Sequence, residues 1–291
     1  MRIELDYSQR EDIFSKMKFP DNEPEMTKEE SAFLCGVIGQ TKPKSVVEVG
    51  IAGGGTTSII LQCLENTTQD YCLNAIDVSE NFYKDSKKKS GYLGEEAFKI
   101  LGVSDEKMHL WLGKPLPYFI DEITRKGKID LILLDTMHMI PGELLDFLVA
   151  LPYLSDDAVV CLHDISLNTR NSLRMNEIAT NVLYNAVVAE KYINYDLVSQ
   201  KRDTYPNIAA FRINKDTIKY IPNVFGLLLL NWEYFPPETD MFKYREVFEK
   251  NYDSDCLEMF DRAYEINKKM RNGTVKERLR KAAKIMLFGK Y

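Results

Sequence analysis

The amino-acid sequence predicts an α/β fold in which a doubly wound, mainly parallel seven-stranded sheet carries helices on both faces and continues into a helical C-terminal extension. Two observations support this prediction. Short β-branched or apolar runs alternate with segments of helical apolar spacing from about residue 31 onward, which is typical of βαβ units. The nearly continuous apolar run Ile129–Asp135 (IDLILLD) is expected of a strand that helices cover on both faces.

The elements follow one another in a regular order. Periodicity predicts five strands with intervening helices and then an antiparallel pair, which together make seven strands with right-handed crossovers. The expected strands are Ser45–Gly50, Tyr71–Val78, Met108–Leu112, Ile129–Asp135, Ala158–His163, Tyr195–Ser199 and Ile208–Ile213. The expected helices are Thr56–Leu64, Gly94–Leu101, Leu116–Thr124, Gly142–Leu154 and Met175–Ala189.

The composition is that of an ordinary globular chain. Hydrophobic residues make up 45% and charged residues 28% of 291 residues, enough to bury a sizeable core. We expect an N-terminal extension over residues 1–30, a main domain over 31–215 and a helical extension over 216–291. The net charge of −6 argues against a general nucleic-acid-binding protein.

The chain shows no sign of export or of a membrane span. Its first thirty residues contain no apolar run typical of a signal peptide, and the apolar run Phe225–Leu230 is too short to cross a bilayer. The five cysteines form no CxxC pair. We therefore expect buried thiols in a reducing cytoplasm, rather than a disulfide framework or a zinc site.

A glycine-rich segment, Glu48–Thr56 (EVGIAGGGT), joins the first expected strand to the first helix. Glycines allow a sharp turn and bring the backbone close to a ligand. A pyrophosphate often binds at such a turn, but Glu48 would repel it and would instead pair with a cationic amino group, such as that of S-adenosylmethionine. Asp77, at the end of the second strand, is placed to accept hydrogen bonds from ribose hydroxyls. A purely structural turn is the plainer alternative.

Two of these runs resemble a known family. VVEVGIAGGGTTSIIL resembles motif I of the class I S-adenosylmethionine-dependent methyltransferases, which have a Rossmann-like fold, and LNAIDVS resembles their second motif. The resemblance implies that Gly50, Gly53 and Gly54 wrap the cofactor and that Asp77 holds its ribose. Leu112–Lys114 departs from the commoner third motif, so the adenine contacts stay open.

Acids and histidines follow the fourth and fifth strands. Asp135 ends the fourth strand, with His138 shortly after it, and His163 and Asp164 follow the fifth. Since the carboxyl ends of parallel strands meet at one edge, we expect these side chains to converge. Two converging carboxylates need a proton or a cation between them, and Mg²⁺ suits such oxygens. A histidine could then remove a proton from a substrate hydroxyl. Helix capping or a loop brace is the alternative.

The run LLDTMHMIPGELLDFLVALPYLSDDAVVCLHDI is similar to the central part of the small-molecule O-methyltransferases of sugar, macrolide and cell-surface glycan modification, over about residues 30–215. In metal-dependent members, the acid matching Asp135 and an acid pair at the position of His163 and Asp164 hold Mg²⁺, and the histidine matching His138 is the proposed base. Here His163 replaces a glutamate. The candidate ligands are therefore Asp135, Asp164 and His163, and a nitrogen stands where an oxygen is usual.

Three further features have simpler explanations. Glu143 and Asp146 lie near the start of a helix, where acids favour the helix dipole. The basic loop Lys84–Lys89 is expected to be solvated, and the alternative is that it covers the cofactor or contacts an anionic substrate. The segment Thr274–Phe288 predicts a helix with one apolar face and a basic remainder. Docking on the body or on a second subunit is favoured for this helix, and contact with a membrane surface is the alternative.

These observations predict an S-adenosylmethionine-dependent O-methyltransferase that acts on a hydroxyl of a sugar-containing or related small molecule, with His138 and Asp135 as catalytic residues. One rival is an NAD-dependent oxidoreductase on the same fold, against which Glu48 argues. Another is a non-catalytic cofactor-binding or interaction protein, against which the presence of Asp135 and His138 beside the glycine loop argues. Fold alone does not decide between them.

Overall fold

The computed structural model describes residues 3–18, 26–194 and 206–271. Their strands form one seven-stranded sheet with the order β3-β2-β1-β4-β5-β7-β6. The pairs among β1 to β5 are parallel, and β7 runs antiparallel to both β5 and β6. The strands are β1 Ser45–Val49, β2 Cys72–Asp77, β3 Met108–Leu112, β4 Ile129–Leu134, β5 Leu154–His163, β6 Glu190–Tyr192 and β7 Ile208–Arg212. The predicted fold class is confirmed.

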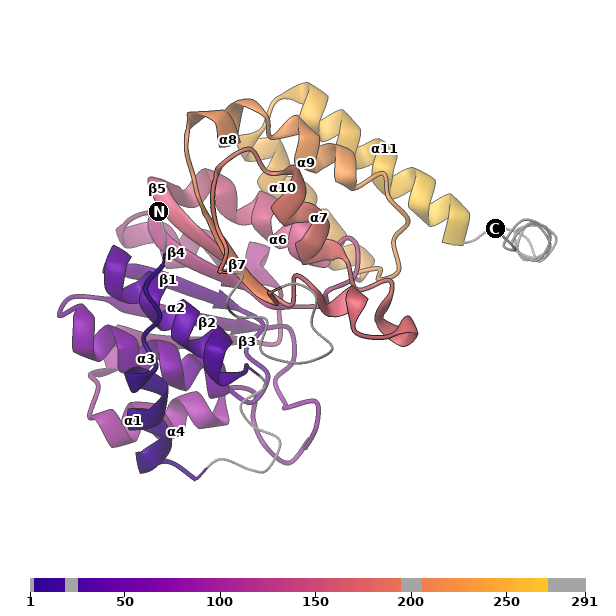
Figure 1. The fold of residues 1–291 in the computed structure, drawn as a ribbon. Coiled ribbons are helices and arrows are strands. Elements are labelled where there is room, and N and C mark those ends of the chain that lie inside the picture. Colours follow the sequence, from indigo (N-terminus) through magenta and orange to yellow (C-terminus); the bar gives the residue numbers. More distant parts are fainter. Residues whose placement is uncertain (1–2, 19–25, 195–205, 272–291) are drawn as a thin grey trace.

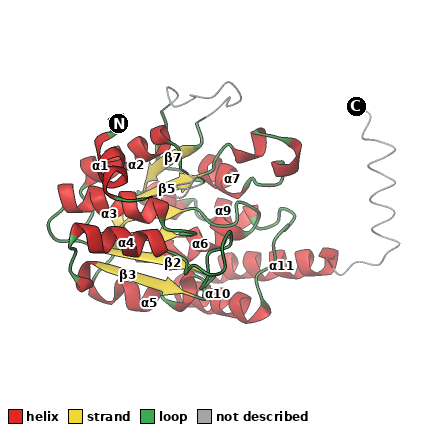
Figure 2. Ribbon diagram, turned by 90° about the horizontal axis from the view of Figure 1, so that it is seen from below, coloured by secondary structure: helices red, strands yellow, loops and turns green. Residues whose placement is uncertain are grey.

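Helices cover both faces of the sheet (Figures 1 and 2). The first face packs against α1 Ser8–Lys16, α2 Lys28–Thr41, α3 Gly55–Thr67 and α4 Tyr92–Leu101. The second face packs against α5 Ile120–Ile123, α6 Gly142–Ala150 and α7 Ala179–Ala186. Beyond these lie α8 Lys215–Lys219, α9 Pro222–Leu227, α10 Glu238–Asn251 and α11 Ser254–Arg271.

Strand alternation divides the core into two clusters. Val46 packs in the cluster beneath α1–α4, whereas its neighbour Val47 packs in the cluster on the opposite face, because successive strand residues point to opposite sides. Phe225, Phe248 and Phe260 of the last helices belong to the same cluster as Val47. The C-terminal helices therefore extend the core of the sheet. The boundaries at residues 30 and 215 stay a prediction.

Some element bounds differ from the expectations. The helix expected over Gly142–Leu154 ends at Ala150, and Leu154 already begins β5, because Leu151–Tyr153 forms a short 3-10 turn around a proline. The helix expected over Met175–Ala189 is shortened to α7. Tyr195–Ser199 and Thr274–Phe288 lie outside the described residues. Among the described helices, none is long and apolar enough to cross a membrane.

Candidate active site

At two positions, the backbone of the glycine loop between β1 and α3 favours glycine. Gly50 and Gly54 both have φ of +89°, a left-handed conformation that L side chains rarely adopt. A Cβ on Gly50 would lie 1.9 Å from the carbonyl oxygen of Asp135, and the backbone nitrogen of Asp135 donates to Val49. The glycine loop thus lies directly against the first residue after β4.

Glu48 lies fully buried beneath this loop. Its Oε2 accepts a hydrogen bond of 2.7 Å from Thr57 Oγ1, whereas its Oε1 has no donor among the described residues. Burial, with smaller contributions from Asp135 and Asp77, raises the pKa of Glu48 to about 8. A buried oxygen without a donor is expected of a ligand site, and an ammonium group would supply both the donor and the opposite charge.

Asp77 joins the end of β2 to the glycine loop. Its Oδ2 accepts hydrogen bonds from the backbone nitrogens of Ile51 at 3.2 Å and Ala52 at 3.0 Å. Its Oδ1 accepts one from Ser79 N at 2.8 Å. Asp77 is half-buried, and because each carboxylate oxygen offers two acceptor sites, Oδ1 can accept one further hydrogen bond. The carboxylate therefore shapes the loop and can still accept a hydrogen bond from a ribose hydroxyl.

The structure brings together the predicted acids and His138. His138 Nε2 lies 3.3 Å from Asp164 Oδ2 and 3.9 Å from Asp135 Oδ1, because the ends of β4 and β5 are adjacent. Together these three side chains offer ligand atoms within 4.8 Å of one another. Both His138 and Asp164 have left-handed backbones, with φ of 57° and 58°, a strain that often marks functional residues.

Glu143 is a site residue that the sequence did not reveal. This fully buried acid of α6 accepts hydrogen bonds at Oε1 from the backbone nitrogens of His138, at 2.8 Å, and Thr136, at 3.1 Å. The same oxygen lies 3.2 Å from His138 Nδ1. The helix-dipole explanation of Glu143 was therefore incomplete, since this acid orients the His138 ring so that Nε2 faces the two aspartates.

The acids around His138 control its proton. Burial alone would lower the pKa of His138, but the contact with Glu143 and the charges of Asp135 and Asp164 raise it to about 9. The same ion pair lowers the pKa of Glu143. A pKa of about 9 favours the cationic form of the His138 ring near neutral pH.

His163 lies beside this cluster, buried among three acids. Its Nδ1 is 3.1 Å from Asp135 Oδ1 and 3.8 Å from Asp164 Oδ2, and its Nε2 is 3.4 Å from Glu30 Oε2. Burial lowers the pKa of His163, but the acids outweigh it and raise that pKa well above its ordinary value.

Glu30 is a second residue that the sequence did not reveal. It caps α2 together with Thr27, a local role that its T-x-x-E pattern indicates.

Two neighbouring segments hold the strained residues in place. The backbone nitrogen of Ala179, at the start of α7, donates to the carbonyl of His138 at 2.9 Å. The side-chain hydroxyl of the following residue, Thr180 Oγ1, donates to the carbonyl of Asp164 at 3.0 Å. Asn207 Nδ2, just before β7, donates to Asp164 Oδ1. These contacts offset the cost of two left-handed residues.

Residues 47–165 match the family described as a methyltransferase domain. This segment runs from β1 to just beyond β5, and it includes Gly50, Asp135, His138 and Asp164. Over this segment, which is less than half of the chain, the sequence is similar to the methyltransferase domain family. No curated protein matches the chain significantly.

Solved structures similar to this chain include three whose descriptions name bound SAM or SAH. One is the O-methyltransferase TomG from Streptomyces achromogenes, involved in tomaymycin synthesis, in complex with SAM: 15% identity, 72% of this chain and 89% of that chain covered, TM-score 0.49. The SAH-bound Podospora anserina methyltransferase PaMTH1 is 16% identical, the match covers 72% of this chain and 87% of that chain, and the TM-score is 0.47. The O-methyltransferase from Bacillus cereus in complex with SAH is 14% identical, the match covers 71% of this chain and 91% of that chain, and the TM-score is 0.46.

Proposed function

We propose that this methyltransferase transfers the methyl group of S-adenosylmethionine to a hydroxyl of a sugar-containing or related small molecule. One observation carries the proposal: the glycine loop and the Asp135–His138–Asp164 cluster meet at Gly50, whose missing Cβ leaves room for the Asp135 carbonyl. A cofactor on the loop and a hydroxyl at the cluster would thus be neighbours, and alignment of the two reactants supplies much of the catalysis.

The cofactor residues have separable roles in this proposal. Glu48 Oε1 would accept from the ammonium group of the methionine part, because it is the buried oxygen without a donor. Gly50, Gly53 and Gly54 would let the backbone approach the ligand closely. Asp77, which already fixes the loop, would accept from the ribose hydroxyls.

His138 would accept the proton of the acceptor hydroxyl at Nε2 while the oxygen–methyl bond forms and the sulfur–methyl bond breaks. Glu143 Oε1 lies 3.2 Å from the other ring nitrogen, and this ion-pair contact would orient the ring, a role that a carboxylate has in catalytic triads. A nearby positive charge lowers the pKa of an imidazole. Binding of the sulfonium cofactor would therefore favour the neutral His138 ring, which can take the proton.

The aspartate oxygens also fit a divalent cation such as Mg²⁺, which prefers oxygen ligands. Asp135 and Asp164 would hold it, and it would lower the pKa of an acceptor hydroxyl. His163 Nδ1 is directed at Asp135 Oδ1, so we propose that this ring adjusts the charge of the aspartates and is a weaker ligand candidate than first expected. We also propose that the acceptor is a small molecule, that the protein is located in the cytoplasm and that it forms a homo-oligomer.

Isothermal titration with S-adenosylmethionine, S-adenosylhomocysteine and NAD⁺, each with and without Mg²⁺, tests the cofactor assignment. We expect binding of the first two ligands, weakened at least about tenfold by Asp77→Ala. Asp70→Ala, at an exposed position just before β2, is the matched control and should bind normally. Tight binding of NAD⁺ alone would replace this proposal with the oxidoreductase. A screen of hydroxylated acceptors with labelled methyl donor then tests the reaction.

A further inference from the structure

The C-terminal helices are connected by hydrogen bonds to the loop after β4, which carries Asp135 and His138. Tyr244 of α10 donates a hydrogen bond of 3.0 Å from its hydroxyl to Asp146 Oδ1 on α6. Asp146 Oδ2 accepts in turn from Thr136 Oγ1 at 3.3 Å. Thr136 directly follows Asp135, so a side-chain relay connects residue 244 to the loop that carries the candidate catalytic groups.

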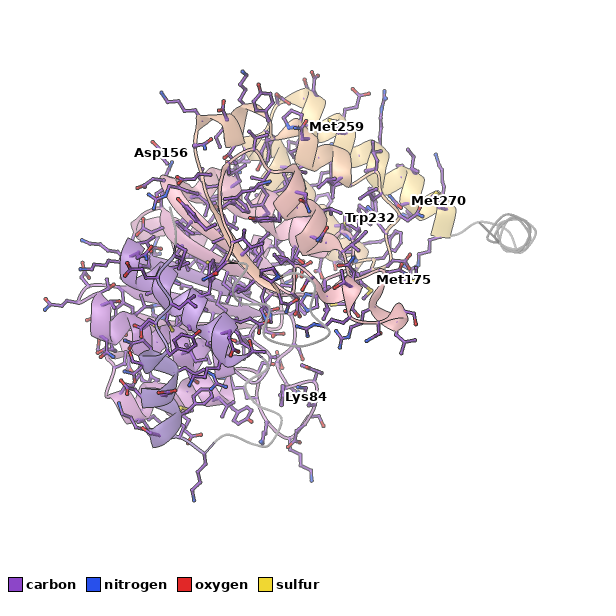
Figure 3. The ribbon with its side chains drawn as sticks, in the orientation of Figure 1. Lys84, Asp156, Met175, Trp232, Met259 and Met270 are labelled. Atoms are coloured by element: carbon purple, nitrogen blue, oxygen red, sulfur yellow. The ribbon has the colours of Figure 1, made fainter. Side chains whose placement is uncertain are left out.

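A second, independent contact holds the other end of the same loop. The backbone nitrogens of Glu233 and Tyr234 both donate to the carbonyl of Ile140, at 3.0 and 3.2 Å. Trp232, labelled in Figure 3 among the C-terminal helices, fixes this segment because its backbone nitrogen donates to Asn267 Oδ1 on α11 at 2.9 Å. The segment 136–140 is thus held at both ends by residues after 230.

The relay lies in an apolar core where polar groups are costly. Tyr244 and Asp146 are each only 5% exposed, and the Tyr244 ring packs near Phe248. A phenylalanine would fill this position without needing a partner, whereas buried polar groups must all be satisfied. The hydroxyl of Tyr244 therefore has a function that packing alone does not explain.

We propose that Tyr244 is a positioning residue for methyl transfer, which holds the Asp135–His138 loop in its active geometry through Asp146 and Thr136. This inference rests on the proposed function of the loop. It gives the C-terminal helices a defined role, because through Tyr244 and Asp146 they hold the same loop whose backbone Glu143 holds.

Tyr244→Phe and Tyr252→Phe form a matched pair for the test. Tyr252 is a second tyrosine at the end of α10, and its hydroxyl donates to the carbonyl of Leu148 on α6 at 2.6 Å, at the end of that helix remote from the loop. We expect Tyr244→Phe to lower kcat about tenfold with little change in the affinity for S-adenosylmethionine. Tyr252→Phe should leave kcat unchanged. Equal kcat values in the two variants would overturn the inference.

An activity-independent readout separates this inference from the proposed function. The chain has three histidines, so imidazole NMR signals of histidine-labelled protein can be assigned by single substitution. Tyr244→Phe should shift the His138 signals at fixed pH, and Tyr252→Phe should not. If Tyr244→Phe fails to fold, Thr136→Val breaks the same relay and should shift the same signals. Shifted signals in a protein without methyl transfer would refute the proposed function alone, whereas unshifted signals would refute the positioning role.

Discussion

At the scale of single residues, Glu143 controls both the orientation and the proton of His138. A neutral ring is needed to accept a proton, so activity should rise as pH passes upward through the pKa of His138. Glu143 raises that pKa. Glu143→Gln removes the charge, and we expect the rising limb of kcat/KM against pH to move to lower pH, with kcat reduced about tenfold or more. Glu122→Gln, on the exposed surface of α5, should leave the profile in place. An unmoved limb in Glu143→Gln would mean that His138 is not the titrating base.

Substitution of a single residue, Gly50, should affect both stability and cofactor binding. Gly50→Ala places a Cβ 1.9 Å from the Asp135 carbonyl at a left-handed φ, so we expect a loss of several degrees in Tm and of cofactor binding. Gly39, inside α2, has nothing within 4 Å of an added Cβ. Gly39→Ala should therefore be neutral or stabilise the protein by about 0.5–1 kcal/mol. Thermal unfolding of both variants, with and without S-adenosylhomocysteine, measures the difference. Similar Tm values would show that the close approach at Gly50 is dispensable.

At the scale of elements, the first turn of α7 fixes both strained site residues. Thr180→Val removes the hydroxyl bond to the Asp164 carbonyl and keeps the shape of the side chain. We expect a stability loss of about 1 kcal/mol and a larger proportional loss of kcat. Thr67→Val removes a hydroxyl bond to the Cys63 carbonyl, far from the site, and should cost stability without the loss of kcat. Parallel losses of kcat in the two variants would contradict the special role of α7.

Elements could be predicted where the sequence carries a local pattern for them. The first and fourth strands and the glycine turn follow from apolar runs and glycines within a few residues. The structure confirms these elements, and each strand ends one residue earlier than expected. The roles of Glu30 and Tyr244 could not be predicted, because their partners His163 and Asp146 are remote in sequence. The T-x-x-E pattern at Thr27 can mark the start of a helix, but no local pattern encodes what the first turn of α2 contacts.

At the scale of the whole molecule, two buried glutamates affect stability in opposite directions. Burial raises the pKa of Glu48 to about 8. Burial would also raise the pKa of Glu30, but the hydrogen bond and charge of His163 outweigh it and lower that pKa to about 2. The folded state thus holds an extra proton on Glu48 above the ordinary glutamate pKa of about 4.3, so the free energy of unfolding falls as pH rises from there to about 8. Glu30 instead contributes stability above about pH 4.3, which is lost as pH falls toward 2.

Substitution of each acid by glutamine separates stability from function. At pH 8, Glu48→Gln should raise the free energy of unfolding by at least about 1 kcal/mol, with little effect near pH 4. The same variant should bind S-adenosylmethionine more weakly, because it loses the carboxylate that would pair with the ammonium group. Glu30→Gln should destabilise the protein at pH 8. Denaturant unfolding at both pH values and cofactor titration measure these changes. If Glu48→Gln is stabilised and binds the cofactor normally, Glu48 is a structural acid whose buried charge serves no ligand.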